Sequence, residues 1–234
     1  MAKKPSPRIS PAKESAETRK RRTRKIAERL AKAYPDARCR LNFSTPFELL
    51  VATILSAQCT DDTVNRVTAN LFRKANTPEA FARMPLADLE KAIHSTGFYH
   101  NKAKSIKKMS EMVVRDFGGQ LPREMDELVK LPGVARKTAN VLRAAAWGLP
   151  GIIVDTHFIR LSERLGLTEN SKPEKIEADL CVMLPKEAWS RFSHTILFHG
   201  RAVCSARKPA CDRCVVNDLC PSAFQFPHFE KGRP

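Results

Sequence analysis

Four cysteines near the C-terminus place the strongest constraint on how this chain folds. They follow the spacing C-x6-C-x2-C-x5-C at Cys204, Cys211, Cys214 and Cys220. Four thiolates in one short loop can wrap a single tetrahedral object, either a zinc ion or an iron-sulfur cluster. Structural zinc sites tend to use two well-separated C-x2-4-C knuckles, whereas only Cys211 and Cys214 form such a knuckle here. The spacing therefore favours a [4Fe-4S] cluster, with zinc as the alternative.

The chain is also strongly basic. Of its 234 residues, 41 are Lys or Arg and 25 are Asp or Glu, which leaves a net charge of +16. This charge is far beyond what solubility needs, so a polyanion is the expected partner. Residues 1–22 are predicted to form a disordered basic tail, which is compatible with a role as a nucleic-acid arm. Arg207 and Lys208, between the first two clustered cysteines, are expected to contact a phosphate backbone.

The sequence contains no sign of a membrane or secretory protein. No stretch is apolar for long enough to span a bilayer, and the N-terminus lacks the apolar region of a signal peptide. Three prolines, Pro5, Pro7 and Pro11, would interrupt the amphipathic helix of a transit peptide. We therefore expect a cytoplasmic protein, associated with the nucleoid if the source is bacterial.

Hydrophobic periodicity predicts an all-α fold, because helical spacing recurs along the chain and no alternating strand pattern interrupts it. Thr45, Pro46 and Glu48 form a strong helix start with a capping box, and Ser171 and Glu174 suggest another. The predicted helices cover residues 26–31, 47–57, 64–72, 80–84, 86–93, 106–117, 125–131, 136–147, 156–165, 171–184 and 188–203.

The segment LPGVARKTA, residues 131–139, places a tight turn directly before a helix. Backbone N–H groups at such a turn have no partner within the helix and can bind a phosphate oxygen. Lys137 is predicted in the first helical turn, where the positive end of the helix dipole and partial burial would both disfavour an ammonium. Since only the free amine attacks carbon, Lys137 is a candidate nucleophile. The alternative is a lysine that only contacts phosphate.

Several motifs together resemble a known family. LPGVARKTA is followed by VDTH at residues 154–157 and by the cysteine motif at 204–220, while LSAQCTD at 55–61 and GFYHNKA at 97–103 precede it. In this order and spacing they resemble the endonuclease III family of base-excision DNA glycosylases. The resemblance covers roughly residues 25–220.

The resemblance implies two helical lobes with a DNA cleft between them. One would be a helical domain, residues 39–149, that contains a helix-hairpin-helix motif. The other would be an iron-sulfur cluster domain made of residues 23–38 and 150–222. Residues 223–234 would form a C-terminal tail. The implied partner is double-stranded DNA that contains a damaged base or an abasic site, bound by a monomeric protein.

The resemblance also assigns roles to single residues. Lys137 would attack C1′ of an oxidised or ring-damaged pyrimidine nucleotide and form a Schiff base, which then permits β-elimination 3′ to the abasic site. Asp155 would be the catalytic aspartate, although an Asp before a helix is by itself an ordinary N-cap. The hairpin residues that would bind DNA are Leu131, Gly133, Ala135 and Arg136.

Gln58 and Phe98 occupy the positions whose side chains would fill the gap left by the extruded nucleotide. Phe98 departs from the leucine that is common there, which leaves the opposite-base preference open. Ala135 replaces the second hairpin glycine, so a left-handed backbone is less favourable at that position.

Three other functions are compatible with parts of the sequence. An adenine-removing mismatch glycosylase would need a carboxylate where this chain has Thr53. A non-enzymatic DNA-binding protein would use the hairpin and the cluster only for docking. An electron carrier would also bind a cluster, but ferredoxins are small and usually acidic.

Overall fold

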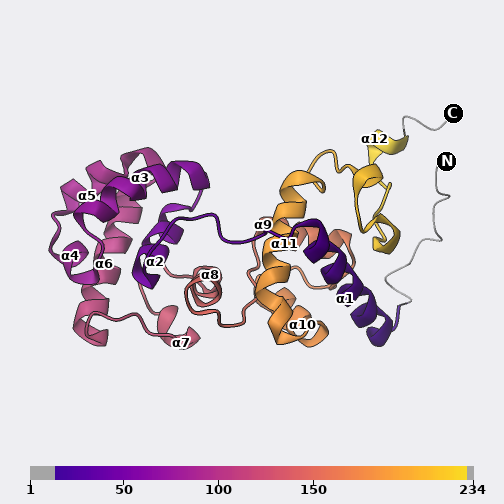
Figure 1. The fold of residues 1–234 in the computed structure, drawn as a ribbon, viewed down its shortest axis with the longest axis horizontal. Coiled ribbons are helices and arrows are strands. Elements are labelled where there is room, and N and C mark those ends of the chain that lie inside the picture. The colour runs from indigo at the N-terminus through magenta and orange to yellow at the C-terminus, as the bar shows by residue number, and fades with distance from the viewer. Residues whose placement is uncertain (1–13, 231–234) are drawn as a thin grey trace. The chain divides into compact units, whose positions relative to one another are not determined.

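The computed structural model describes residues 14–230, and every regular element within them is a helix (Figure 1). The predicted all-α class is therefore confirmed. The chain divides into two compact units. The first, Cys39–Leu149, is called the helical unit below. The second consists of the residues up to Arg38 together with those from Pro150 onward, and it is called the cysteine unit because it contains the four clustered cysteines.

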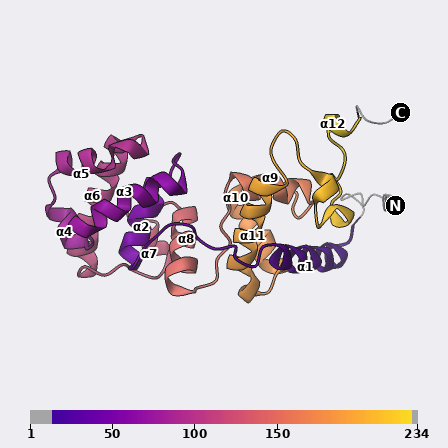
Figure 2. The ribbon, with the colours of Figure 1, turned by 45° about the horizontal axis from the view of Figure 1, so that its top comes forward.

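The helical unit surrounds its most apolar helix. Its elements are α2 (Pro46–Leu55), α3 (Asp61–Lys74), α4 (Pro78–Arg83), α5 (Leu86–Ile93), η2 (His94–Thr96), α6 (Tyr99–Phe117), α7 (Met125–Leu128) and α8 (Arg136–Trp147). Helix α2 packs against α3, α6 and α8 (Figure 2). Leu49, Leu50 and Leu55 of α2 have no exposed surface, so this helix forms the centre of the unit.

The start of α2 follows the predicted capping pattern. Thr45 is the N-cap, and its Oγ1 accepts a hydrogen bond of 3.1 Å from the amide of Glu48. The Glu48 carboxylate turns back to accept a 2.5 Å bond from the amide of Ser44. The two bonds satisfy amides at the helix entrance and fix where the chain enters the core.

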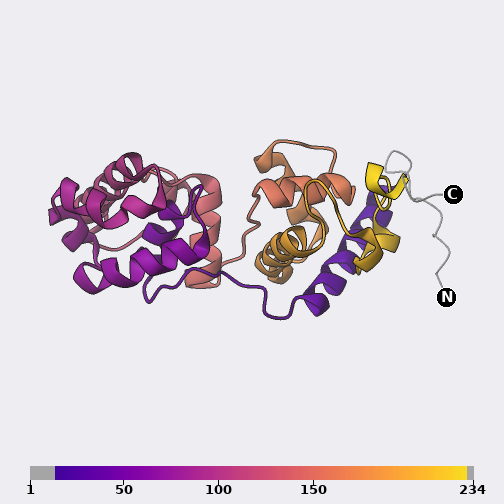
Figure 3. The same ribbon diagram turned by 90° about the horizontal axis from the view of Figure 1, so that it is seen from above.

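The cysteine unit combines the first described helix with the last third of the chain. Its elements are α1 (Ala16–Ala33), α9 (Thr156–Arg164), α10 (Pro173–Met183), η3 (Lys186–Ala188), α11 (Trp189–Ala202), η4 (Cys211–Arg213), η5 (Asn217–Leu219) and α12 (Pro227–Glu230). Helix α1 packs against α10 and α11, and Figure 3 shows it beside the yellow C-terminal segment. Ile26 and Leu30 of α1 enter the same core as Phe158 and Phe192.

The prediction of a disordered tail over residues 1–22 is wrong for its last part. Helix α1 begins at Ala16, with Ser15 as N-cap accepting a 3.2 Å bond from the amide of Thr18. Arg22 is buried. A cap and a buried arginine thus extend the helix into a segment whose charge alone suggested disorder. Residues 1–13 lie outside the described residues.

Further helix boundaries differ from the predictions, among them the starts of α3, α6 and α10 and the end of α7. The Ser171/Glu174 capping box is absent, because α10 begins at Pro173 with Lys172 as its N-cap and no side-chain cap. Helix α6 begins at Tyr99 instead of residue 106, since the exposed polar residues His100, Asn101 and Lys104 interrupt the apolar periodicity in its first turns. None of the helices in residues 14–230 has the combination of length and apolar character that a membrane span requires.

Candidate nucleic-acid interface and metal centre

The hairpin between α7 and α8 is a tight turn built on Pro132 and Gly133. The amide of Val134 donates a 3.0 Å hydrogen bond to the carbonyl of Leu131, and Gly133 has φ +81°. A Cβ atom at Gly133 would lie 2.9 Å from Cβ of Ser105 in α6, so glycine is needed for both its conformation and its close packing. Leu131 is buried and anchors the turn, which explains how the hairpin is held on the helical unit.

Helix α8 starts immediately after this turn. Ala135 is its N-cap in an extended conformation, φ −84° and ψ 165°, and α8 has no side-chain cap. The expectation that Ala135 avoids the left-handed region is confirmed. The amides of the first turn therefore have no acceptor from a capping side chain, which is the arrangement that binds phosphate oxygens at helix N-termini.

Lys137 lies in this first turn and is exposed. Arg136 beside it is exposed as well. The partial burial expected for Lys137 is thus not present within its own unit. An exposed amine at the start of a helix can reach a bound molecule directly, and the adjacent guanidinium and amides provide positive potential for a phosphate.

Gln58 and Phe98 share an unusual backbone conformation. Gln58 has φ 52° and Phe98 has φ 50°, whereas non-glycine residues rarely adopt the left-handed region. Both side chains are exposed, and Phe98 is 64% exposed although it is a large aromatic residue. Each lies in a loop next to a helix, with Gln58 between α2 and α3 and Phe98 at the start of α6. Strained backbone combined with an exposed side chain is typical of a contact site.

Asp155 lies at the start of α9 in the cysteine unit. Its Oδ1 accepts a 2.7 Å hydrogen bond from the amide of Phe158, so it is the N-cap of that helix. Among the described residues, its Oδ2 accepts no hydrogen bond. One carboxylate oxygen therefore fixes the side chain while the other remains available. The units are compact separately, and Lys137 and Asp155 come from different units.

Helix α9 connects Asp155 to the cysteines. Nη2 of Arg160 donates to the carbonyls of Gly200 and Cys204, at 3.1 and 3.0 Å. One turn later, Nη1 of Arg164 donates 3.3 Å to Sγ of Cys204 and 2.8 Å to the carbonyl of Ser205. A single helix thus carries the candidate carboxylate at one end and supports the first cysteine at the other.

The four clustered cysteines line one cavity together with apolar residues from α9, α11 and the C-terminal segment. Phe226 is among the lining residues. Cζ of Arg164 lies over the Phe226 ring, 4.7 Å from the ring centroid. The segment assigned to a C-terminal tail, residues 223–234, therefore contributes in its described part to this cavity. No three His, Cys, Asp or Glu side chains of the described chain lie close enough together to hold a single metal ion.

The buried environment of these cysteines makes their thiolate form costly unless a metal balances the charge. Burial raises the pKa of Cys214 to about 11 and that of Cys220 to about 12. Burial raises the pKa of Cys211 as well. Bound iron would hold these sulfurs as thiolates, since a metal ligand must be deprotonated. His199 Nε2 lies 3.3 Å from Cys214 Sγ, and its Nδ1 lies 2.9 Å from the Tyr34 hydroxyl. Such contacts orient metal-binding sulfurs.

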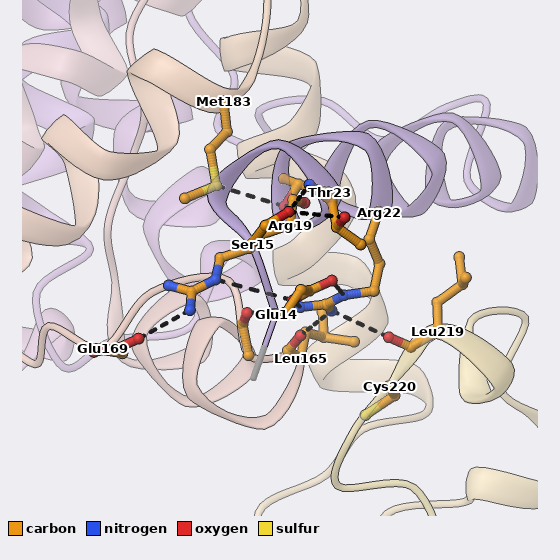
Figure 4. A network of polar contacts seen from close by, with 12 residues as sticks. Glu14, Ser15, Arg19, Arg22, Thr23, Leu165, Glu169, Met183, Leu219 and Cys220 are labelled. Atoms are coloured by element: carbon orange, nitrogen blue, oxygen red, sulfur yellow. Dashed lines mark hydrogen bonds and ion pairs between the residues drawn. The ribbon is translucent and has the colours of Figure 1, made fainter. Parts of the chain in front are cut away.

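Arg22 secures the last cysteine of the motif. Figure 4 shows its guanidinium between Glu14, Leu165 and Leu219, with Cys220 next to Leu219. It forms a two-pronged ion pair with Glu14 at 2.9 and 2.7 Å. It also donates to the carbonyls of Leu165, Gly166 and Leu219, at 2.5, 2.8 and 3.1 Å. Because the Leu219 carbonyl belongs to the peptide before Cys220, Arg22 fixes the chain at that cysteine.

Arg207 and Lys208 lie in a short loop that the structure holds in place. Nη2 of Arg164 donates 2.7 Å to the carbonyl of Ala206, and the Ser205 hydroxyl donates 2.7 Å to the carbonyl of Lys208. Both basic side chains are exposed. The loop is therefore fixed through its backbone while its charges point to solvent.

Family models and relatives agree with these features. Residues 51–186 match the HhH-GPD superfamily of base excision DNA repair proteins, and residues 204–220 match the iron-sulfur binding domain of endonuclease III. Endonuclease III of Synechocystis sp. is 52% identical over 207 residues, covering 88% of this chain and 94% of the relative. The chain belongs to the endonuclease III family. It is thus a base excision repair enzyme, a DNA glycosylase with AP lyase activity, and it has a [4Fe-4S] cluster, whose binding domain matches residues 204–220.

Solved structures of the family include complexes with DNA. A non-covalent endonuclease III–DNA complex and a trapped endonuclease III–DNA covalent intermediate each match with a TM-score of 0.83 and 44% identity. Each match covers 91% of this chain and 97% of the solved chain. Like these relatives, this endonuclease III family member is a DNA-binding protein. Four cysteine ligands would leave such a cluster no open position for a substrate.

Proposed function

We propose that this enzyme is a bifunctional glycosylase and AP lyase that removes oxidised or ring-damaged pyrimidines from double-stranded DNA. The observation that carries the proposal is the position of Lys137, an exposed amine in the first turn of α8 directly after the hairpin. A phosphate bound by the hairpin amides would place the neighbouring sugar within reach of this amine. The proposal is further supported by the trapped covalent intermediate of a relative.

Lys137 provides the nucleophile for both steps. Its neutral amine attacks C1′ of the damaged nucleotide, and the bond between C1′ and the base breaks, so that the base leaves with the bonding electrons and takes up a proton. The sugar ring then opens to a Schiff base between Nζ and C1′. Loss of a proton from C2′ breaks the bond between C3′ and its oxygen, which releases the 3′ phosphate.

Asp155 stabilises positive charge at C1′ and accepts a proton during the reaction. The bond from the Phe158 amide to Oδ1 holds the carboxylate at the start of α9 and leaves Oδ2 for this role. A carboxylate fixed in this way does not have to reorganise when charge develops.

The remaining contacts position the duplex. Gln58 and Phe98 fill the space of the extruded nucleotide, since unstacking costs a few kcal/mol and needs replacement contacts. The hairpin residues and the pair Arg207 and Lys208 bind phosphates. We propose that a single chain acts as a monomer.

Borohydride trapping on abasic DNA tests the nucleophile. We expect wild-type enzyme to form a covalent adduct and Lys137→Gln to form none, because the reduced Schiff base needs the amine. Lys130→Gln is the matched control, since Lys130 is an exposed lysine of the same hairpin. It should weaken DNA binding slightly and retain the adduct. An equal adduct with Lys137→Gln would disprove the assignment.

The lesion class is tested separately with duplexes that contain thymine glycol, oxidised cytosine, uracil or a plain abasic site. We expect cleavage at the two oxidised pyrimidines and at the abasic site. Cleavage at the abasic site alone would show that the glycosylase part of the proposal is wrong while leaving the lyase part intact.

A further inference from the structure

Lys102 is a buried lysine in the second turn of α6. Only 6% of its surface is exposed, and its Nζ donates 2.8 Å hydrogen bonds to the carbonyls of Leu55 and Thr96. Within the described residues, no carboxylate forms an ion pair with this ammonium. Burying a charge without a counter-ion is costly, so the hydrogen bonds to the two carbonyls are what stabilises the buried ammonium.

The two carbonyls belong to the last residues of the elements that precede the loops of Gln58 and Phe98. Leu55 is the last residue of α2, three residues before Gln58, and Thr96 is the last residue of η2, two residues before Phe98. Gln58 and Phe98 both have positive φ and exposed side chains. A left-handed non-glycine residue costs on the order of 1 kcal/mol and persists only where its surroundings hold it. Through its two hydrogen bonds, Lys102 connects the residues at which both loops start.

We propose that Lys102 is a positioning residue for nucleotide extrusion, which holds the loops of Gln58 and Phe98 at a fixed separation. The inference rests on the proposed function, in which these two side chains enter the DNA. When the loops are held together, both side chains can occupy the gap in one binding event. Without the ammonium the loops move independently, and the gap is filled less often at the moment of reaction.

The same helix contains a natural control. Nζ of Lys107 donates to the carbonyls of Ala82 and Met84, at 2.7 and 3.0 Å, and so holds the end of α4. Like Lys102, Lys107 donates to two carbonyls at the end of a helix, although it is only half-buried and also pairs with Glu111 at 3.5 Å. Its carbonyl acceptors do not precede either strained loop. A purely structural role of Lys102 would therefore give the same phenotype as Lys107.

The experiment compares Lys102→Met, Lys107→Met, Phe98→Ala and wild type, all in the full-length enzyme with its cluster. Binding is followed by the fluorescence of 2-aminopurine placed next to a tetrahydrofuran abasic analogue, because this base brightens when it unstacks. Single-turnover cleavage of thymine glycol DNA and affinity for undamaged DNA are measured in parallel. We expect Lys102→Met and Phe98→Ala to lose most of the fluorescence increase and about tenfold in single-turnover rate. Affinity of Lys102→Met for undamaged DNA should be unchanged, and Lys107→Met should match wild type in all three measurements.

The possible results distinguish the positioning role of Lys102 from the gap-filling role of Phe98. If Phe98→Ala loses the signal while Lys102→Met behaves like Lys107→Met, Lys102 is not a positioning residue and the proposed function stands. If Phe98→Ala matches wild type, the gap-filling role fails and the inference fails with it. Lys102→Gln, which keeps a shorter neutral donor, should fall between Lys102→Met and wild type. It serves as the test if Lys102→Met does not keep its native helix content.

Discussion

The two units of this protein are stabilised in different ways. The helical unit has a large apolar core around α2. Lys102 and Lys107 stabilise it further by donating hydrogen bonds to carbonyls at the ends of helices. The cysteine unit has a smaller apolar core, and its cysteine loop is held by arginines that donate to backbone carbonyls. Arg164 serves the first ligand and Arg22 the last.

This difference indicates which unit depends on the cluster. A large apolar core can support a fold by itself, whereas a short irregular loop with little core needs cross-links. The cluster and the arginines supply these cross-links in the cysteine unit. The side chains of the helical unit that we propose to contact DNA are, in contrast, positioned by packing and should not need iron.

Removing the cluster should give the largest effect and should affect one unit only. We expect Cys211→Ser to lose bound iron, because one of four thiolate ligands is replaced by a weakly binding hydroxyl. Residues 150–222 should then become sensitive to protease, and DNA affinity should fall because Arg207 and Lys208 lose their fixed loop. Iron content, limited proteolysis and DNA binding are the measurements.

Cys181→Ser is the control for this change, since Cys181 is a half-buried thiol of the same unit that does not line the cavity. It should keep its iron and its affinity. If hydrogen exchange in α2 and α8 rises in Cys211→Ser as much as in α9 and α11, the helical unit is not independent and the comparison is wrong.

Loss of the Arg22 contacts should have the next largest effect. Replacing a residue that supports a metal ligand typically costs about 10- to 100-fold in metal affinity. We therefore expect Arg22→Met to release iron to a chelator faster by a factor in this range. Arg22→Lys should be intermediate, because a lysine keeps the charge but not the planar set of donors. Loss of the visible absorbance of the cluster is the measurement.

Lys25→Met provides the comparison, since Lys25 is exposed on the same helix. Glu14→Gln should accelerate iron loss less than Arg22→Met, because Arg22 keeps its three carbonyl acceptors. Equal rates of iron loss in Arg22→Met and Lys25→Met would show that the cluster does not need this contact.

The sequence predicted the elements whose signals are local. The capping residues of α2, the Pro-Gly turn of the hairpin and the spacing of the cysteines are each readable within a few residues, and the all-α fold follows from the periodicity. The cysteine spacing predicted the iron-sulfur centre, and the family resemblance predicted the class of enzyme. The roles of Lys137 and Asp155 remain proposals because they depend on DNA.

The contacts that sequence reasoning missed join residues far apart in the chain. Arg22 reaches carbonyls at Leu165 and Leu219, and its charge suggested a solvated tail. One signal was present, because Arg22 lies four residues before Ile26 and eight before Leu30, on the apolar stripe of α1. Lys102 is on the stripe of Ile106 and Met109 in the same way. A basic residue on an apolar stripe therefore indicates a buried cation that binds carbonyls.

The smallest effect in this series should separate backbone strain from packing in the hairpin. Gly133 and Gly148 flank α8 and have φ +81° and +64°. Alanine at Gly148 meets nothing within 4 Å, so Gly148→Ala should cost only the left-handed conformation, about 1 kcal/mol. Alanine at Gly133 would also press on Ser105, and such overlap adds about 1–3 kcal/mol.

Hydrogen exchange of α6 and α8 amides in the intact enzyme measures the loss of stability in both variants. Gly133→Ala should also weaken DNA binding, because the turn carries the amides that face phosphate, whereas Gly148→Ala should not. If both variants lose the same stability and neither loses DNA affinity, the hairpin is not held by its contact with α6 and its geometry does not serve DNA.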